Sequence, residues 1–258
     1  MKRDALLLPT LLALLSSSIH AQEPSNTSGD PAQLAQQLMQ TEVAFENMVP
    51  TGTSIEVKET SRHGTSSKDL VVTYRIYIKG SSPDTLFDWV QWPVNQQQPS
   101  TALSGISVGK DGLLICAGRK PTQCGDPAKP DDPIDFTSTP RKGEPVRFAF
   151  LSQALKIGTV IIPDPIASSD RGCTLSAVRL TPKFELAFFS GTGYPPNTDI
   201  HYQFISERTS DRTIKSNENG VIRVSQIPFP GNKSKGIATF KVISPQCSPE
   251  VSYEWGTI

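Results

Sequence analysis

One acidic segment of the sequence carries the residue types of a calcium site. Four aspartates lie within ten residues of each other: Asp126, Asp131, Asp132 and Asp135. Carboxylate oxygens are the ligands that Ca²⁺ prefers in proteins. Prolines interrupt the run, however, and its spacing differs from that of an EF-hand loop. The segment is therefore a candidate calcium site, and the alternative is an acidic surface loop balanced by neighbouring basic side chains.

Two nearby tryptophans, Trp89 and Trp92, have the side chains of a sugar-stacking platform. Aromatic rings combine a large apolar face with a polar tip, which suits a sugar ring. Residues three apart in a regular strand point to opposite faces, so both rings reach one face only if the strand bulges near Pro93. The alternative is one core tryptophan and one surface or edge tryptophan.

Hydrolytic chemistry has little support in the sequence. Beyond residue 21 the only histidines are His63 and His201, and neither lies in a recognisable nucleophile motif or has zinc-ligand spacing. A glycosidase needs two carboxylates across a cleft. Strand-associated candidates for such a pair are Glu185, Glu207 and Glu254. We therefore expect no catalytic centre, no cofactor and no metal beyond the calcium candidate.

The first 21 residues have the pattern of a secretory signal peptide. A basic start, Met1-Lys2-Arg3, precedes an apolar run at residues 5–15 that is too short to cross a bilayer, and Ala21 suits cleavage before Gln22. We therefore expect a secreted or periplasmic protein. No later segment has the roughly 18 apolar residues of a membrane helix, so no transmembrane segment is expected.

Charge excludes one class of partner. The sequence has 25 basic and 25 acidic residues, and removal of residues 1–21 leaves a net charge close to −1. No basic stripe stands out along the chain. The electrostatic footprint of a nucleic-acid-binding protein is therefore missing, and we expect no nucleic-acid partner.

The four cysteines predict two disulfides, because an exported chain matures in an oxidising compartment. Four sulfurs permit three pairings, and proximity in the sequence favours Cys116–Cys124 and Cys173–Cys247. The shorter bridge would lie at the base of the longest irregular segment, residues 117–142. Long loops of this kind are often functional or disordered.

The remaining sequence divides into segments of different periodicity. Residues 22–49 combine a polar leader with an amphipathic helix that begins at Asp30-Pro31 and either packs on a sheet or binds a partner. Short period-two runs fill residues 50–165 and 173–258, and residues 166–172 have the composition of a linker. The sequence therefore predicts an all-β fold of two β-sandwich domains with one short N-terminal helix.

The last third of the sequence resembles a known kind of module. The stretch SGTGYPPN at residues 190–197 is followed by Asn219-Gly220, by prolines at 228 and 230, and by GIATF at 236–240. This pattern resembles bacterial secreted immunoglobulin-like β-sandwich modules, which implies an immunoglobulin-like fold and a hairpin turn at Asn219-Gly220. Only one copy of the pattern is recognisable. Such modules occur in adhesins, enzymes and surface proteins alike, so the resemblance carries over fold and not activity.

Three functions fit these features. We expect a non-enzymatic envelope or extracellular protein with a binding or structural role, which contacts an unidentified protein or polysaccharide through its loops or sheet edges. A secreted polysaccharide-active hydrolase is one alternative. A carbohydrate-binding accessory module is the other, and it requires Trp89 and Trp92 on one exposed face.

Overall fold

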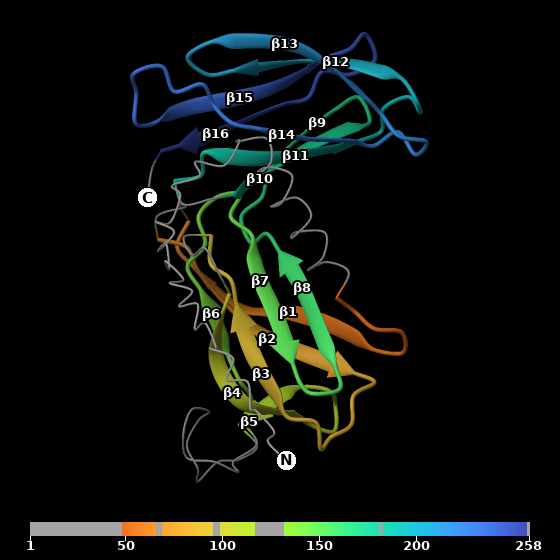
Figure 1. Cartoon of the computed structure of the whole chain (residues 1–258), viewed down its shortest axis with the longest axis vertical. Coiled ribbons are helices and arrows are strands. Elements are labelled where there is room, and N and C mark those ends of the chain that lie inside the picture. The colour runs from red at the N-terminus through yellow and green to blue at the C-terminus, as the bar shows by residue number, and fades with distance from the viewer. Residues whose placement is uncertain (1–47, 66–68, 95–98, 117–131, 181–182, 257–258) are drawn as a thin grey trace, which may run out of the picture.

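The chain is described by a computed structural model over residues 48–65, 69–94, 99–116, 132–180 and 183–256. These residues form sixteen β-strands and no helix, so the all-β class predicted from the sequence is confirmed (Figure 1). The predicted N-terminal helix lies outside the described residues. Within them, no helix has the length and apolar character needed to cross a bilayer.

Two antiparallel sheets form a first sheet pair, coloured orange to green in Figure 1. One sheet has the strand order β1-β2-β6, and the other has the order β5-β4-β3-β7-β8. The strands are β1 (Ser54–His63), β2 (Val71–Lys79), β3 (Phe87–Gln91), β4 (Ser100–Val108), β5 (Leu114–Cys116), β6 (Phe136–Ser138), β7 (Val146–Leu151) and β8 (Lys156–Ile161). Every second residue of β2 is buried, as expected when one face of a sheet covers a core.

Aromatic rings fill the space between these two sheets. Phe136 of β6 packs edge-on against Trp89 of β3, with ring centroids 4.8 Å apart. The same ring lies 5.9 Å from Phe148 and 5.8 Å from Phe150, both on β7 in the opposite sheet. Each such side chain buries about 150–250 Å². One side chain of β6 therefore contacts three rings of the opposite sheet.

A second sheet pair, coloured green to blue in Figure 1, has the strand orders β9-β10-β11-β14 and β13-β12-β15-β16. Its strands are β9 (Ile166–Asp170), β10 (Cys173–Leu180), β11 (Leu186–Thr192), β12 (Asp199–Ile205), β13 (Thr209–Lys215), β14 (Ile222–Gln226), β15 (Gly236–Ile243) and β16 (Glu250–Trp255). Seven strands repeat one order in both pairs: β1, β2 and β6 correspond to β10, β11 and β14, and β4-β3-β7-β8 corresponds to β13-β12-β15-β16. β5 and β9 are the additional strands.

The second core is also aromatic. Phe240 of β15 stacks on Phe189 of β11 at 4.4 Å and on Tyr202 of β12 at 4.6 Å. The Tyr202 phenol is buried, and Gln226 Nε2 donates a hydrogen bond to its oxygen at 2.9 Å. Because Gln226 ends β14 in the opposite sheet, this hydrogen bond joins the two sheets and fixes the end of β14.

Two segments differ from the sequence-based expectation. Residues 166–172 were expected to be a linker, but β9 occupies most of this segment and pairs with β10. A two-residue turn makes this hairpin, because Arg171 and Gly172 both have positive φ angles of 45° and 90°.

The second difference concerns Asn219-Gly220, which does not form a hairpin. β13 and β14 lie in different sheets, so this turn connects the two layers. The Asn217 side-chain oxygen accepts the amides of Asn219 and Val221, both at 2.9 Å, and thereby turns the chain out of β13.

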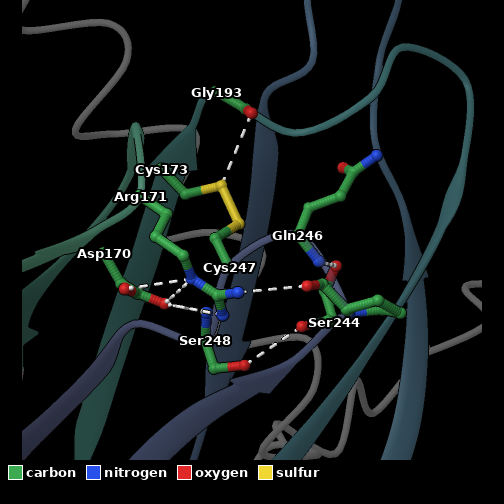
Figure 2. Close-up of polar contacts among 9 residues, drawn as sticks. Asp170, Arg171, Cys173, Gly193, Ser244, Gln246, Cys247 and Ser248 are labelled. Carbon is green, nitrogen blue, oxygen red and sulfur yellow. Dashed lines mark hydrogen bonds and ion pairs between the residues drawn. A yellow bond between two sulfur atoms is a disulfide. The ribbon is translucent and has the colours of Figure 1, made fainter.

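The predicted Cys173–Cys247 disulfide is confirmed (Figure 2). It joins the first residue of β10 to the loop between β15 and β16. We call this end of the second sheet pair the disulfide end. Ser248 Oγ donates to Ser244 O at 3.2 Å, which tightens the same loop.

The β9–β10 turn holds this loop from the other side (Figure 2). Asp170 accepts the Ser248 amide at 2.6 Å and pairs with Arg171, whose Nη1 donates to Pro245 O at 3.2 Å. The Ser248 amide and the Arg171 guanidinium together hold the pKa of the Asp170 carboxyl below its usual value. The disulfide end is therefore fixed by a covalent bond and by polar contacts.

A turn at residues 141–144 joins the two sheet pairs. The Gly143 amide donates to Asp164 O at 2.6 Å, and the Gly143 carbonyl accepts the amide of Arg179 in β10 at 2.7 Å. Arg62 at the end of β1 donates to Pro163 O at 3.0 Å. The first sheet pair is therefore hydrogen-bonded both to β10 and to the connection between β8 and β9.

Replacing both Cys173 and Cys247 with serine should lower the free energy of unfolding by about 4 kcal/mol. The bridge closes a segment of 74 residues and so reduces the entropy of the unfolded chain. Urea denaturation of the oxidised protein and of the double variant measures the difference. Equal midpoints for the two proteins would contradict this prediction.

Gly220→Ala should destabilise the protein more than Gly172→Ala. Both glycines have positive φ angles, which costs an alanine about 1–2 kcal/mol. A Cβ at Gly172 would meet open space, whereas a Cβ at Gly220 would collide with the backbone carbonyl of Tyr194. Thermal unfolding of the two variants gives the comparison, and a cost at Gly220 no larger than that at Gly172 would refute it.

Candidate functional site

The two predicted sugar-binding tryptophans have different surroundings in the structure. Trp89 pairs with Phe150 of β7 and packs into the first core. Trp92 follows β3, and its ring lies 5.7 Å from the guanidinium of Arg147. The Trp89 ring packs against Phe136 at 4.8 Å and against Phe148 at 6.4 Å, so it is engaged in the core. Sugar binding by either tryptophan stays a prediction.

The candidate calcium ligands are described only in part. Asp126 and Asp131 lie outside the described residues, whereas Asp132 and Asp135 are exposed on the approach to β6. Asp135 accepts a hydrogen bond from Arg75 Nε at 2.9 Å, so an arginine neutralises its charge. Among the residues with described positions, no cluster of three or more His, Cys, Asp or Glu side chains has metal-binding geometry. Calcium binding stays a prediction.

Other predicted residues are spread over the fold. Cys116 is disulfide-bonded at the end of β5, and its predicted partner Cys124 lies outside the described residues. His63 ends β1 in the first sheet pair, and His201 lies on β12 in the second. The Glu207 carboxylate is paired with Lys233 Nζ at 2.8 Å.

Two exposed apolar side chains lie on the loop at residues 227–233 of the second sheet pair. This loop contacts residues 206–208, and we call the two segments the Phe229 loop pair. Ile227 is 38% exposed and Phe229 is 42% exposed, whereas Pro228 between them is buried. This alternation continues the period of β14 beyond Gln226, where the strand ends. The buried proline therefore anchors the segment, and its two neighbours point to solvent.

The shorter loop fixes the longer one through backbone contacts. The Ser206 hydroxyl accepts the Phe229 amide at 3.0 Å and donates to the Phe229 carbonyl at 3.3 Å. The Arg208 guanidinium lies 4.1 Å from the centre of the Phe229 ring, a favourable cation–π contact. The Lys233–Glu207 ion pair closes the far side of the loops. One hydroxyl thus satisfies both polar backbone groups of Phe229 and holds its ring outward.

This arrangement suits recognition of another molecule. Aromatic and arginine side chains are enriched among the residues that dominate binding energy in protein interfaces. Side chains that are already ordered lose less entropy when they bind. The Phe229 loop pair presents an ordered aromatic ring, an aliphatic side chain and a guanidinium together.

The sequence alone does not predict this site. The prolines around Phe229 fit the module pattern, and Glu207 is one of the possible acids. The signal that was present is the alternation of apolar residues with proline in IPFP, residues 227–230. The contact that orders the ring comes from Ser206, 23 residues earlier in the chain, and no local pattern reports it.

Comparisons of this chain with protein-family models, with curated proteins and with solved structures find no match.

Proposed function

We propose that this chain is a non-enzymatic secreted or envelope protein that binds a protein partner through the Phe229 loop pair. The observation that carries the proposal is the ordered, exposed Phe229 ring, held by Ser206 and covered on one face by Arg208. Exposed loops on a rigid scaffold are where binding residues concentrate. The Phe229 loop pair lies on such a scaffold, which is the second sheet pair.

A protein partner fits this surface better than a polysaccharide. Sugars stack on an open aromatic face, and Arg208 lies over the Phe229 ring. The accessible surface instead joins the other parts of that ring to the exposed Ile227 side chain and to a basic group. Mixed aromatic, aliphatic and arginine surfaces are typical of the centres of protein interfaces.

We infer further that the two sheet pairs are immunoglobulin-like domains of a bacterial secreted protein. Support comes from the shared order of seven antiparallel strands, with consecutive hairpins and crossings between layers, which is the arrangement of Greek-key sandwiches. The Cys173–Cys247 disulfide supports export, because such bonds persist in oxidising compartments.

Phe229→Ala should weaken partner binding by about 2 kcal/mol, or roughly thirtyfold in Kd, while leaving unfolding stability within about 0.5 kcal/mol. The matched control is Leu86→Ala, which removes a side chain of similar exposure, 44%, from the first sheet pair. Affinity capture from the envelope and medium of the source organism, followed by titration of the captured protein, measures the effect.

Selective loss of one protein with Phe229→Ala, and its retention with Leu86→Ala, would support the proposal. Equal capture by both variants would contradict the proposal. Capture of polysaccharide in place of protein, or turnover of a polysaccharide substrate, would favour the accessory-module or hydrolase function instead.

A further inference from the structure

The outer side of β13 is an open strand edge. β13 is the end strand of its sheet (Figure 1), and its seven residues pair with β12 without a register shift. Among the edge strands of the described sheets only β1 is longer, and β1 has a register shift between Glu59 and Ser61. Natural proteins use bulges and prolines to block the addition of another strand, and β13 contains neither.

Hydrogen bonds at the two ends of β13 show which backbone groups face this open edge. The Ser216 amide donates to the Thr198 carbonyl at 2.9 Å. The Arg208 carbonyl accepts the Ser206 amide at 3.0 Å. Ser216 and Arg208 therefore direct their backbone groups toward the β12 side, and successive residues of a strand direct theirs to opposite edges. The residues whose N–H and C=O groups face the open edge are Thr209, Asp211, Thr213 and Lys215, all of them exposed.

We propose that β13 pairs antiparallel with β13 of a second copy of this chain, so that two four-stranded sheets join into one continuous sheet. The pairing would satisfy the outward N–H and C=O groups, which no other strand of the described sheets does. Addition of a strand to an exposed sheet edge is a recurring mode of protein association. This inference goes beyond the proposed function, because the partner is the chain itself.

The charges of β13 select one register of this pairing. A two-fold symmetric antiparallel pair is centred on a residue, because opposite side chains must lie on the same face of the sheet. Three such registers, centred on Asp211, Arg212 or Thr213, align at least five residues of β13. The first two place like charges directly opposite each other, which is destabilising. The third places Asp211 of each copy opposite Lys215 of the other and therefore makes two pairs of opposite charge.

The inner face of β13 fits the same register. Ile214 is partly buried against the second core, and Arg212 on the same face of the strand is exposed. Centring on Thr213 places Arg212 of each copy opposite Ile214 of the other. The aliphatic part of an arginine covers apolar surface while its guanidinium stays in water. Apolar contact therefore accompanies the backbone hydrogen bonds and the charge pairs.

The paired chains would present two copies of the Phe229 loop pair. Residues 206–208 precede β13 directly, so the two loop pairs lie at opposite ends of the paired strands. In the register centred on Thr213, the Thr209 residues of the two copies are about 27 Å apart, at 3.4 Å per residue. A partner with two matching surfaces would therefore engage both copies and gain avidity.

Sedimentation velocity of the full chain over a concentration series tests the proposal. The unmodified chain should form a reversible dimer with a Kd of about 10–100 µM, because one pair of edge strands makes a small interface. Asp211→Lys and Lys215→Asp each place like charges at both charge pairs, so either variant alone should dimerise at least tenfold more weakly. An equimolar mixture of the two variants restores opposite charges at both positions and should recover the dimer.

Glu250→Lys is the matched control. It changes an exposed acid to lysine on the outer face of the same sheet, but on β16 at the opposite edge. Its dimerisation should equal that of the unmodified chain, and thermal unfolding verifies that all variants are folded. A chain that stays monomeric at millimolar concentration, single variants that dimerise normally, or a mixture that does not recover the dimer would each overturn the proposal. Binding of an extended peptide from another protein along β13 of a monomer would also overturn it.

Discussion

The buried guanidinium of Arg179 constrains the whole end of the second sheet pair. Burial lowers the pKa of this side chain by penalising its charge, and the protein offsets part of that cost with the Glu254 carbonyl and the Phe184 ring. The Arg179 backbone amide simultaneously binds Gly143 of the first sheet pair. One residue therefore joins β10 to the opposite sheet and to the other half of the molecule.

Local alternation of apolar and polar residues predicts most of this fold. β2 is easy to recognise because Val72, Tyr74, Ile76 and Ile78 are all buried. β4 is hard to recognise, because serine, glycine and threonine dominate it and its pairing with β3 is irregular. β9 has the composition of a loop and becomes a strand because Ile166 is buried in the second core. Strands of this kind depend on long-range pairing, which a local pattern does not encode.

The strand order that the two sheet pairs share is a second feature of the structure that the sequence pattern does not predict. Only the last third of the chain has the recognisable module pattern, yet the first sheet pair has the same seven-strand order. Its turn residues differ, and the added β5 changes the spacing. Layer packing needs apolar residues at alternate positions and accepts many sequences at the turns. Topology therefore persists where turn motifs do not.

The two ends of the second sheet pair differ in how their loops are held and in what they expose. At the disulfide end, Cys173–Cys247 and the Asp170 contacts fix the loops. At the other end, β10 finishes beside the 141–144 turn of the first sheet pair, and β12 and β14 lead into the Phe229 loop pair. The Phe229 loop pair and the contact between the sheet pairs therefore lie at the same end, opposite the disulfide.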